Sequence, residues 1–164
     1  MSSLHLIPMG DAFDLLAPHA SVMDVLDLIH SERPFWIAGG YLRDQHLGRG
    51  FKDIDVFFSG TATRCEDSDR YGSAHWITVA GTEVNLIFKE AEHDITSLVQ
   101  SFDIGLCQII RARDGAVYAT DRYLKDVRDR TITVLRRPEI PSDFEHIQRV
   151  HEKFPNFTVI HAYE

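Results

Sequence analysis

Two aspartates separated by one residue stand in an apolar stretch of the chain, Lys52-Asp53-Ile54-Asp55-Val56-Phe57-Phe58. Alternate side chains of a β-strand share a face, so Asp53 and Asp55 point the same way, about 6.6 Å apart along the strand. Two carboxylates on one face repel each other unless a cation lies between them. Mg²⁺ suits such a pair because it takes oxygen ligands and keeps positions open for substrate phosphates. The pattern predicts a magnesium site, with two ions in the arrangement used for phosphoryl-type transfer.

A pair of glycines, Gly39 and Gly40, precedes the aspartates and is followed by Arg43 and Asp44. Glycines carry no side chain, so their backbone N–H groups can approach a phosphate closely, and a following helix N-terminus favours anions. We therefore expect this turn to hold a triphosphate. Arg43 or Lys52 would neutralise its charge.

The two motifs, in this order and this close together, resemble the first motif of the DNA polymerase β-like nucleotidyltransferase superfamily. The closest likeness is to the head domain of class II CCA-adding enzymes and bacterial poly(A) polymerases. Their pattern of Gly-Gly-x-x-Arg-Asp, a Leu-Leu-Gly-Arg-type loop and Lys-Asp-x-Asp is matched by residues 39–44, 46–49 and 52–55. The resemblance implies that Asp53 and Asp55 are catalytic metal ligands. The residues that it places around the nucleotide are Gly39, Gly40, Arg43, Asp44 and Lys52.

Glu83 is one candidate for a third carboxylate. It opens the segment Glu83-Val84-Asn85-Leu86-Ile87-Phe88, which resembles an acid-bearing Glu-Val-x-x-Phe-like strand of class II enzymes. By that likeness, Glu83 would hold the metal or orient the attacking hydroxyl. An exposed acid just after a turn explains the residue equally well.

Asp103 is the rival candidate, in a segment that resembles the family's second motif, Arg-Arg-Asp-Phe-Thr-x-Asn-Ala. In that motif the acid lies near the nucleotide sugar. Gln100 and Ser101 replace the arginines in this chain, and Leu106 replaces the asparagine. Asp103 alone carries over, as a nucleotide-binding residue or as the third carboxylate.

The order of expected elements is mixed, with hairpins at Gly81 and Asp114-Gly115 rather than alternating βα units. Strands are expected over 35–38, 52–58, 74–80, 82–88, 102–110, 116–120, 132–135 and 157–161, and helices over 21–31, 41–48, 91–101, within 121–130 and over 143–153 after Ser142. This order predicts an α+β protein with a mixed, mostly antiparallel sheet and helices packed on one side, and the resemblance implies the polymerase β-like nucleotidyltransferase fold. We expect one domain over residues 1–164, with a helical lead-in at 1–34 and a C-terminal helix and tail at 138–164.

The totals fit a small soluble protein of 164 residues with a formal net charge of −8. That charge argues against a surface that grips nucleic acid everywhere, although Arg128, Arg130, Arg136 and Arg137 form a local basic cluster or are merely scattered over the surface. The longest apolar runs are far short of a membrane span, and the chain does not open with a basic, then apolar signal sequence. The two cysteines form no metal-binding pattern and are expected to be reduced thiols in a cytoplasmic protein.

Two functions fit these observations. The first is a Mg²⁺-dependent nucleotidyltransferase that moves a nucleoside monophosphate from an NTP to an acceptor hydroxyl and releases pyrophosphate. The acceptor would be an RNA 3′ end, a protein side chain or a small molecule. The second is a catalytically inactive nucleotide-binding or interaction module with the same fold. It is kept open by the lost arginines of the second motif and by the expectation that the helical neck, body and tail that grip tRNA in that family do not fit in the remaining residues. The family's base-reading motif also has only a poor candidate, residues 144–149.

Overall fold

A computed structural model describes residues 6–9, 35–50, 53–58, 68–69, 72–79, 81–88, 94–112 and 115–163. The expected helix at 21–31, Lys52 and Cys65 lie outside these residues. Most of the expected lead-in at 1–34 also lies outside them.

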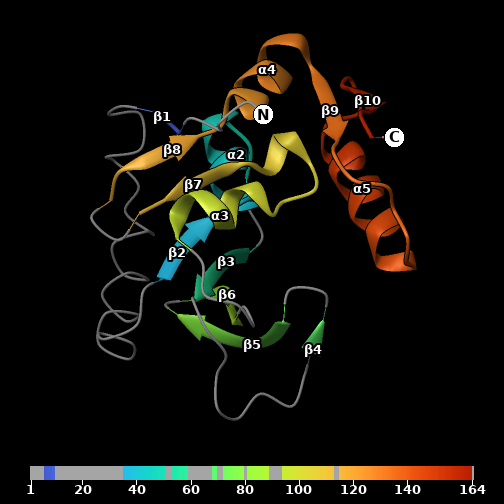
Figure 1. Ribbon diagram of the computed structural model, residues 1–164. Helices are drawn as coiled ribbons and strands as arrows, with labels where there is room; N and C mark the ends of the chain where they lie inside the picture. The colour runs from blue at the N-terminus through green and yellow to red at the C-terminus, as the bar shows by residue number, and fades with distance from the viewer. Residues whose placement is uncertain are drawn as a thin grey trace.

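An eight-stranded sheet forms the centre of the described structure, in the order β1-β8-β7-β2-β3-β6-β5-β4 (Figure 1). The strands are β1 (Ile7–Pro8), β2 (Phe35–Ala38), β3 (Asp53–Phe58), β4 (Ser68–Asp69), β5 (Gly72–Val79), β6 (Thr82–Phe88), β7 (Ile109–Arg111) and β8 (Val117–Ala119). Neighbouring strands pair antiparallel except β3 and β6, which run parallel. The expected mixed, mostly antiparallel sheet is therefore confirmed, and so are both hairpins.

The apolar residues of β3 explain why this strand lies in the middle of the sheet. Ile54, Val56 and Phe58 are fully buried on one face, where α2 (Gly40–His46) packs Tyr41 and Leu42 against the core. A strand that is buried along its length on one face fixes its register, because a slip by one residue would expose the whole set.

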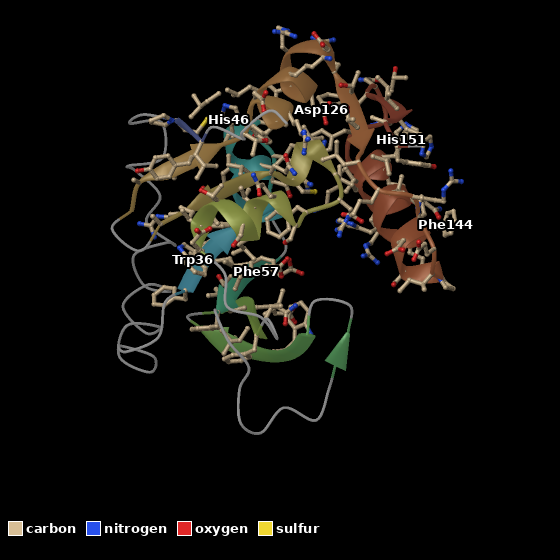
Figure 2. The ribbon with its side chains drawn as sticks, viewed as in Figure 1. Trp36, His46, Phe57, Asp126, Phe144 and His151 are labelled. Atoms are coloured by element: carbon tan, nitrogen blue, oxygen red, sulfur yellow. The ribbon has the colours of Figure 1, made fainter. Side chains whose placement is uncertain are left out.

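The opposite face of β3 also has a buried part. Phe57, labelled in Figure 2, belongs to a second buried cluster with Leu98 and Val99 of α3 (Ile95–Gln100). The centre of its ring lies 5.2 Å from that of Phe102. The aspartates share this face with Phe57. One end of the face is thus covered by α3, and the end with the carboxylates is left for a site.

The expected strand over residues 102–110 is wrong as a continuous strand. Only an isolated bridge at Ile104, a 3₁₀ helix η2 (Gly105–Cys107) and the short β7 are present. Gly105 accounts for the break: a Cβ there would lie 2.8 Å from an Asp126 carboxylate oxygen. The chain turns where it passes closely under α4 (Asp121–Asp129).

The C-terminal part differs from expectation in two details. The last helix, α5 (Pro141–Lys153), begins at Pro141 rather than after Ser142, since proline suits the first helical position. The strand β10 (Thr158–His161) is present, but it pairs in parallel with β9 (Thr131–Val134) as a separate two-stranded sheet. Figure 1 shows α5 beside the main sheet, reached through β9.

Asp126 fastens α4 to β9. Its carboxylate accepts hydrogen bonds from the hydroxyls of Thr131 and Thr133, both at 2.6 Å, and from the Thr133 backbone N–H at 3.0 Å. The residue is 1% exposed. Three donors are therefore satisfied by one buried acid.

We expect Asp126→Ala to destabilise the protein by about 3 kcal/mol, because it leaves three half-buried donors without their acceptor. Asp129→Ala on the same helix is the matched control, since the Asp129 carboxylate pairs with the exposed Arg128 and ion pairs exposed to solvent contribute little to stability. Urea unfolding of both variants measures the difference. Equal losses of stability in the two variants would show that Asp126 does not fasten α4 to β9.

Candidate active site

A cavity of about 500 Å³ lies between the carboxylate-bearing face of the sheet and α5. Its walls come from four parts of the fold. The lining residues include Asp53, Asp55, Phe57, Trp76, Asn85 and Ile87 from the sheet, Gly39, Gly40 and Arg43 from the turn after β2, Phe102, Asp103 and Cys107 around η2, and His146, Arg149, Val150 and Lys153 from α5.

The two aspartates of β3 both line this cavity, as their alternation predicts. Burial, followed by repulsion from Asp53, raises the pKa of Asp55 to about 7. Asn85, His146 and Lys153 act in the opposite direction but do not cancel these effects. The pair is therefore short of positive charge, and a cation between the carboxylates would relieve both causes.

The two glycines of the turn have different roles. Gly39 has φ +81, a region that L side chains rarely adopt, and its N–H donates to the Ile109 carbonyl at 3.0 Å. Gly39 thus builds the turn. Gly40 leaves space: a Cβ there would lie 3.2 Å from a terminal nitrogen of Arg43. The missing side chain opens the guanidinium to the cavity.

Arg43 is buried and contacts Asp44 on α2 and Phe154, the residue after the end of α5. Its Nε donates to Asp44 Oδ1 at 3.0 Å, and the guanidinium lies 5.1 Å from the centre of the Phe154 ring. The other oxygen of Asp44 accepts from Lys153 Nζ at 3.1 Å. Asp44 therefore joins α2 to α5 and orients two cations that line the cavity, while it is not itself among the lining residues.

His146 of α5 approaches Asp103, the acid of the segment that resembles the second motif. Its Nδ1 lies 3.5 Å from Asp103 Oδ1. Burial alone would lower the pKa of His146, but the neighbouring Asp103 and Cys107 outweigh it and raise the pKa to about 9. His146 is therefore positively charged at neutral pH and already balances the charge of Asp103.

Glu83 lies at the edge of this arrangement. The parallel register of β3 and β6 puts Glu83 beside Asp53 and Asn85 beside Asp55, so all four share one face. The Glu83 side chain is exposed and is not among the residues that line the cavity, whereas Asp103 lines it. Which of the two is the third carboxylate stays a prediction.

The structure thus brings together Gly39, Gly40, Arg43, Asp53, Asp55 and Asp103 around one cavity. Lys52 lies outside the described residues. The sequence patterns did not identify the contribution of α5, namely His146, Arg149 and Lys153. Their spacing of three and four residues along a helix puts them on one face, and this signal is present in the sequence.

The oxygen ligands at this site suit a hard divalent cation, but they are few. Asp53 and Asp55 offer carboxylate oxygens on one face, next to the amide of Asn85. Among the described residues, no three His, Cys, Asp or Glu side chains gather closely enough to hold a metal ion by themselves. A cation at this position would need ligands from a substrate, as Mg²⁺ commonly does with phosphates.

Comparison with known proteins gives matches at the level of structure. No family model and no curated protein sequence matches this chain. The Thermotoga maritima CCA-adding enzyme complexed with tRNA superposes with a TM-score of 0.70 at 15% identity, over 96% of this chain and 43% of that one. The Bacillus stearothermophilus CCA-adding enzyme in complex with CTP gives 0.68 at 14% identity, over 88% and 41%.

These likenesses establish the fold. The chain shares the fold of these CCA-adding enzymes over most of its length, and this confirms the expected polymerase β-like nucleotidyltransferase fold. It spans less than half of the length of these solved structures. Among the described residues, no helix has the length and apolar character needed to cross a membrane.

Proposed function

We propose that this protein is a metal-dependent nucleotidyltransferase that transfers a nucleoside monophosphate from an NTP to an acceptor hydroxyl, with release of pyrophosphate. The observation that carries the proposal is the pairing of Asp53 and Asp55 with Arg43 behind the Gly39–Gly40 turn, all around one cavity. Structural neighbours include proteins described in complex with CTP and with tRNA, which supports an NTP donor and an RNA acceptor.

We assign residues in or beside the cavity to the triphosphate, to the metal ion and to the acceptor hydroxyl. Arg43, oriented by Asp44, faces the triphosphate through the space left at Gly40, and Lys153 adds a second cation nearby. Asp53 and Asp55 would hold Mg²⁺, which supplies charge stabilisation for the transferred phosphoryl group. Glu83, beside Asp53, would orient the acceptor hydroxyl or complete the metal site.

The direct test incubates the full chain with Mg²⁺, each of the four NTPs and a pool of cellular RNA, and measures pyrophosphate and labelled RNA. Pyrophosphate release that requires Mg²⁺ and RNA is expected. NTP binding by calorimetry without any turnover would instead identify an inactive nucleotide-binding module. Absence of both binding and turnover would contradict the proposal.

We expect Gly40→Val to weaken NTP binding about 10-fold or more while the fold is kept. The branched side chain would displace the Arg43 guanidinium and close its access to the cavity. Gly50→Val is the matched control, because no atom of the described residues beyond its chain neighbours lies within 4 Å of a Cβ at Gly50. Calorimetric titration with a non-hydrolysable NTP analogue measures the effect. Equal affinities in both variants would move the triphosphate site elsewhere.

A further inference from the structure

Trp76 is the most exposed large apolar side chain among the described residues, with 58% of its surface accessible, yet it lines the cavity. It lies on β5 opposite Asn85 of β6, and Asn85 lies beside Asp55 of β3. Paired residues of neighbouring strands point to the same face, so Asp55, Asn85 and Trp76 form one row across three strands. The row spans about 10 Å, at roughly 4.8 Å per strand.

The strand order puts the glycine turn and the Asn85–Trp76 row on opposite sides of β3. The Gly39–Gly40 turn and Arg43 follow β2, on one side of β3, whereas β6 and β5 lie on the other side. In phosphoryl transfer the attacking and leaving oxygens are roughly in line. If the pyrophosphate leaves toward Arg43, the attacking hydroxyl must arrive over β6 and β5, where Trp76 is.

Asn85 supplies a polar atom in the same row. Its Oδ1 is buried and has no hydrogen-bond partner within the described part of the chain. A buried acceptor without a donor is costly, so a ligand hydroxyl would be favoured there. The position between Asp55 and Trp76 suits a ribose whose base extends toward β5.

We propose that Trp76 and Asn85 form the subsite for the 3′-terminal nucleotide of a single-stranded RNA acceptor. The base stacks on the indole, and a ribose hydroxyl donates to Asn85 Oδ1. This inference rests on the proposed function and names its acceptor. A stacked aromatic platform accepts any base, since every base has a π-face.

The charges on this side of the cavity favour stacking over phosphate contacts. The lining residues that come from β5 and β6 are Trp76, Asn85 and Ile87, and none of them is charged. The two acids nearest Asn85 and Trp76 on the same face, Asp55 and Glu83, are negative and would repel phosphates. The net charge of the whole chain is −8. Affinity for the RNA end should therefore depend little on salt, unlike binding through many phosphates.

Tryptophan fluorescence tests the subsite without requiring turnover. The chain has two tryptophans, Trp36 and Trp76, so the loss of a signal in Trp76→Leu identifies its source. A short single-stranded oligoribonucleotide should quench the wild-type protein in a saturable way, and Trp76→Leu should abolish that quenching. In steady-state assays, Trp76→Leu should raise the KM for the oligonucleotide about 10-fold and leave the KM for NTP unchanged. Trp76→Phe should keep most of the affinity.

Phe144→Leu is the matched control, because Phe144 is 57% exposed but lies on α5 and does not line the cavity (Figure 2). An oligonucleotide that ends in a 2′-deoxynucleotide should bind a few-fold more weakly, since Asn85 loses its donor. Equal affinities for the oligonucleotides that end in a ribonucleotide and in a 2′-deoxynucleotide would show that Asn85 is not part of the subsite.

The failure of this inference differs from the failure of the proposed function. If NTP alone quenches Trp76 and Trp76→Leu raises only the KM for NTP, the indole belongs to the donor nucleotide and the inference is overturned, while the transferase stands. If RNA quenches Trp76 but no pyrophosphate is ever formed, the subsite stands and the transferase activity does not. Loss of oligonucleotide affinity in Phe144→Leu as large as in Trp76→Leu would also overturn the inference.

Discussion

Asp53→Ala and Asp55→Asn are each expected to reduce nucleotidyl transfer by about 10³-fold or more. A metal ion held by these carboxylates would contribute several kcal/mol of charge stabilisation, and each 1.36 kcal/mol corresponds to about tenfold in rate. Pyrophosphate release under saturating Mg²⁺ measures the loss. Asp129→Asn, at an exposed ion pair, is the control. Near wild-type turnover in either active-site variant would make the metal assignment wrong.

The same variants should keep the fold, and Asp55→Asn should be more stable than the wild type without metal. The folded protein raises the pKa of Asp55 from 3.8 to about 7, because the carboxyl is buried beside Asp53. Between these values the native state binds more protons than the unfolded state, so stability falls as pH rises. Asparagine removes that charge.

Thermal melts in a chelator test the sign of this effect. We expect Asp55→Asn to melt several degrees above the wild type at pH 8, and the difference to shrink as the pH falls toward 4. Added Mg²⁺ should stabilise the wild type more than the variant, because a ligand of the native state shifts the equilibrium toward it. A variant less stable than the wild type at pH 8 would contradict the raised pKa of Asp55.

The sequence predicted the part of the site that depends on local patterns. Alternation along β3 put Asp53 and Asp55 on one face, and the paired glycines marked the turn before α2. These features need only the residues of one strand or one turn. They could therefore be predicted from the sequence without knowledge of any tertiary contact.

The contribution of α5 was not readable in the same way. Lys153 reaches Asp44 across 109 positions of the chain, and His146 meets Asp103 through packing of α5 beside η2. The break at Gly105 likewise follows from the approach of Asp126, which lies on another element. Long-range packing decided each of these features, and it leaves little trace in a local pattern.

The second large effect concerns the third carboxylate, where Glu83 and Asp103 remain rivals. Glu83 lies beside Asp53 in the register of β3 and β6, and its side chain is exposed at the edge of the site. Asp103 is buried and lies 3.5 Å from the charged His146. A carboxylate that already faces a cation has less charge to offer a metal. We therefore expect Glu83 to act at the metal site and Asp103 to act on the nucleotide.

Glu83→Gln should then lower kcat about 10²-fold with little change in NTP affinity, because the amide keeps the shape but loses the charge. Asp103→Asn should mainly change NTP affinity or the choice between ribose and deoxyribose. Glu145→Gln on the exposed side of α5 is the control for glutamate removal. Steady-state kinetics with ATP and dATP, and calorimetry with a non-hydrolysable analogue, separate the two effects. The reverse pattern, with kcat lost in Asp103→Asn and kept in Glu83→Gln, would assign the third carboxylate to Asp103.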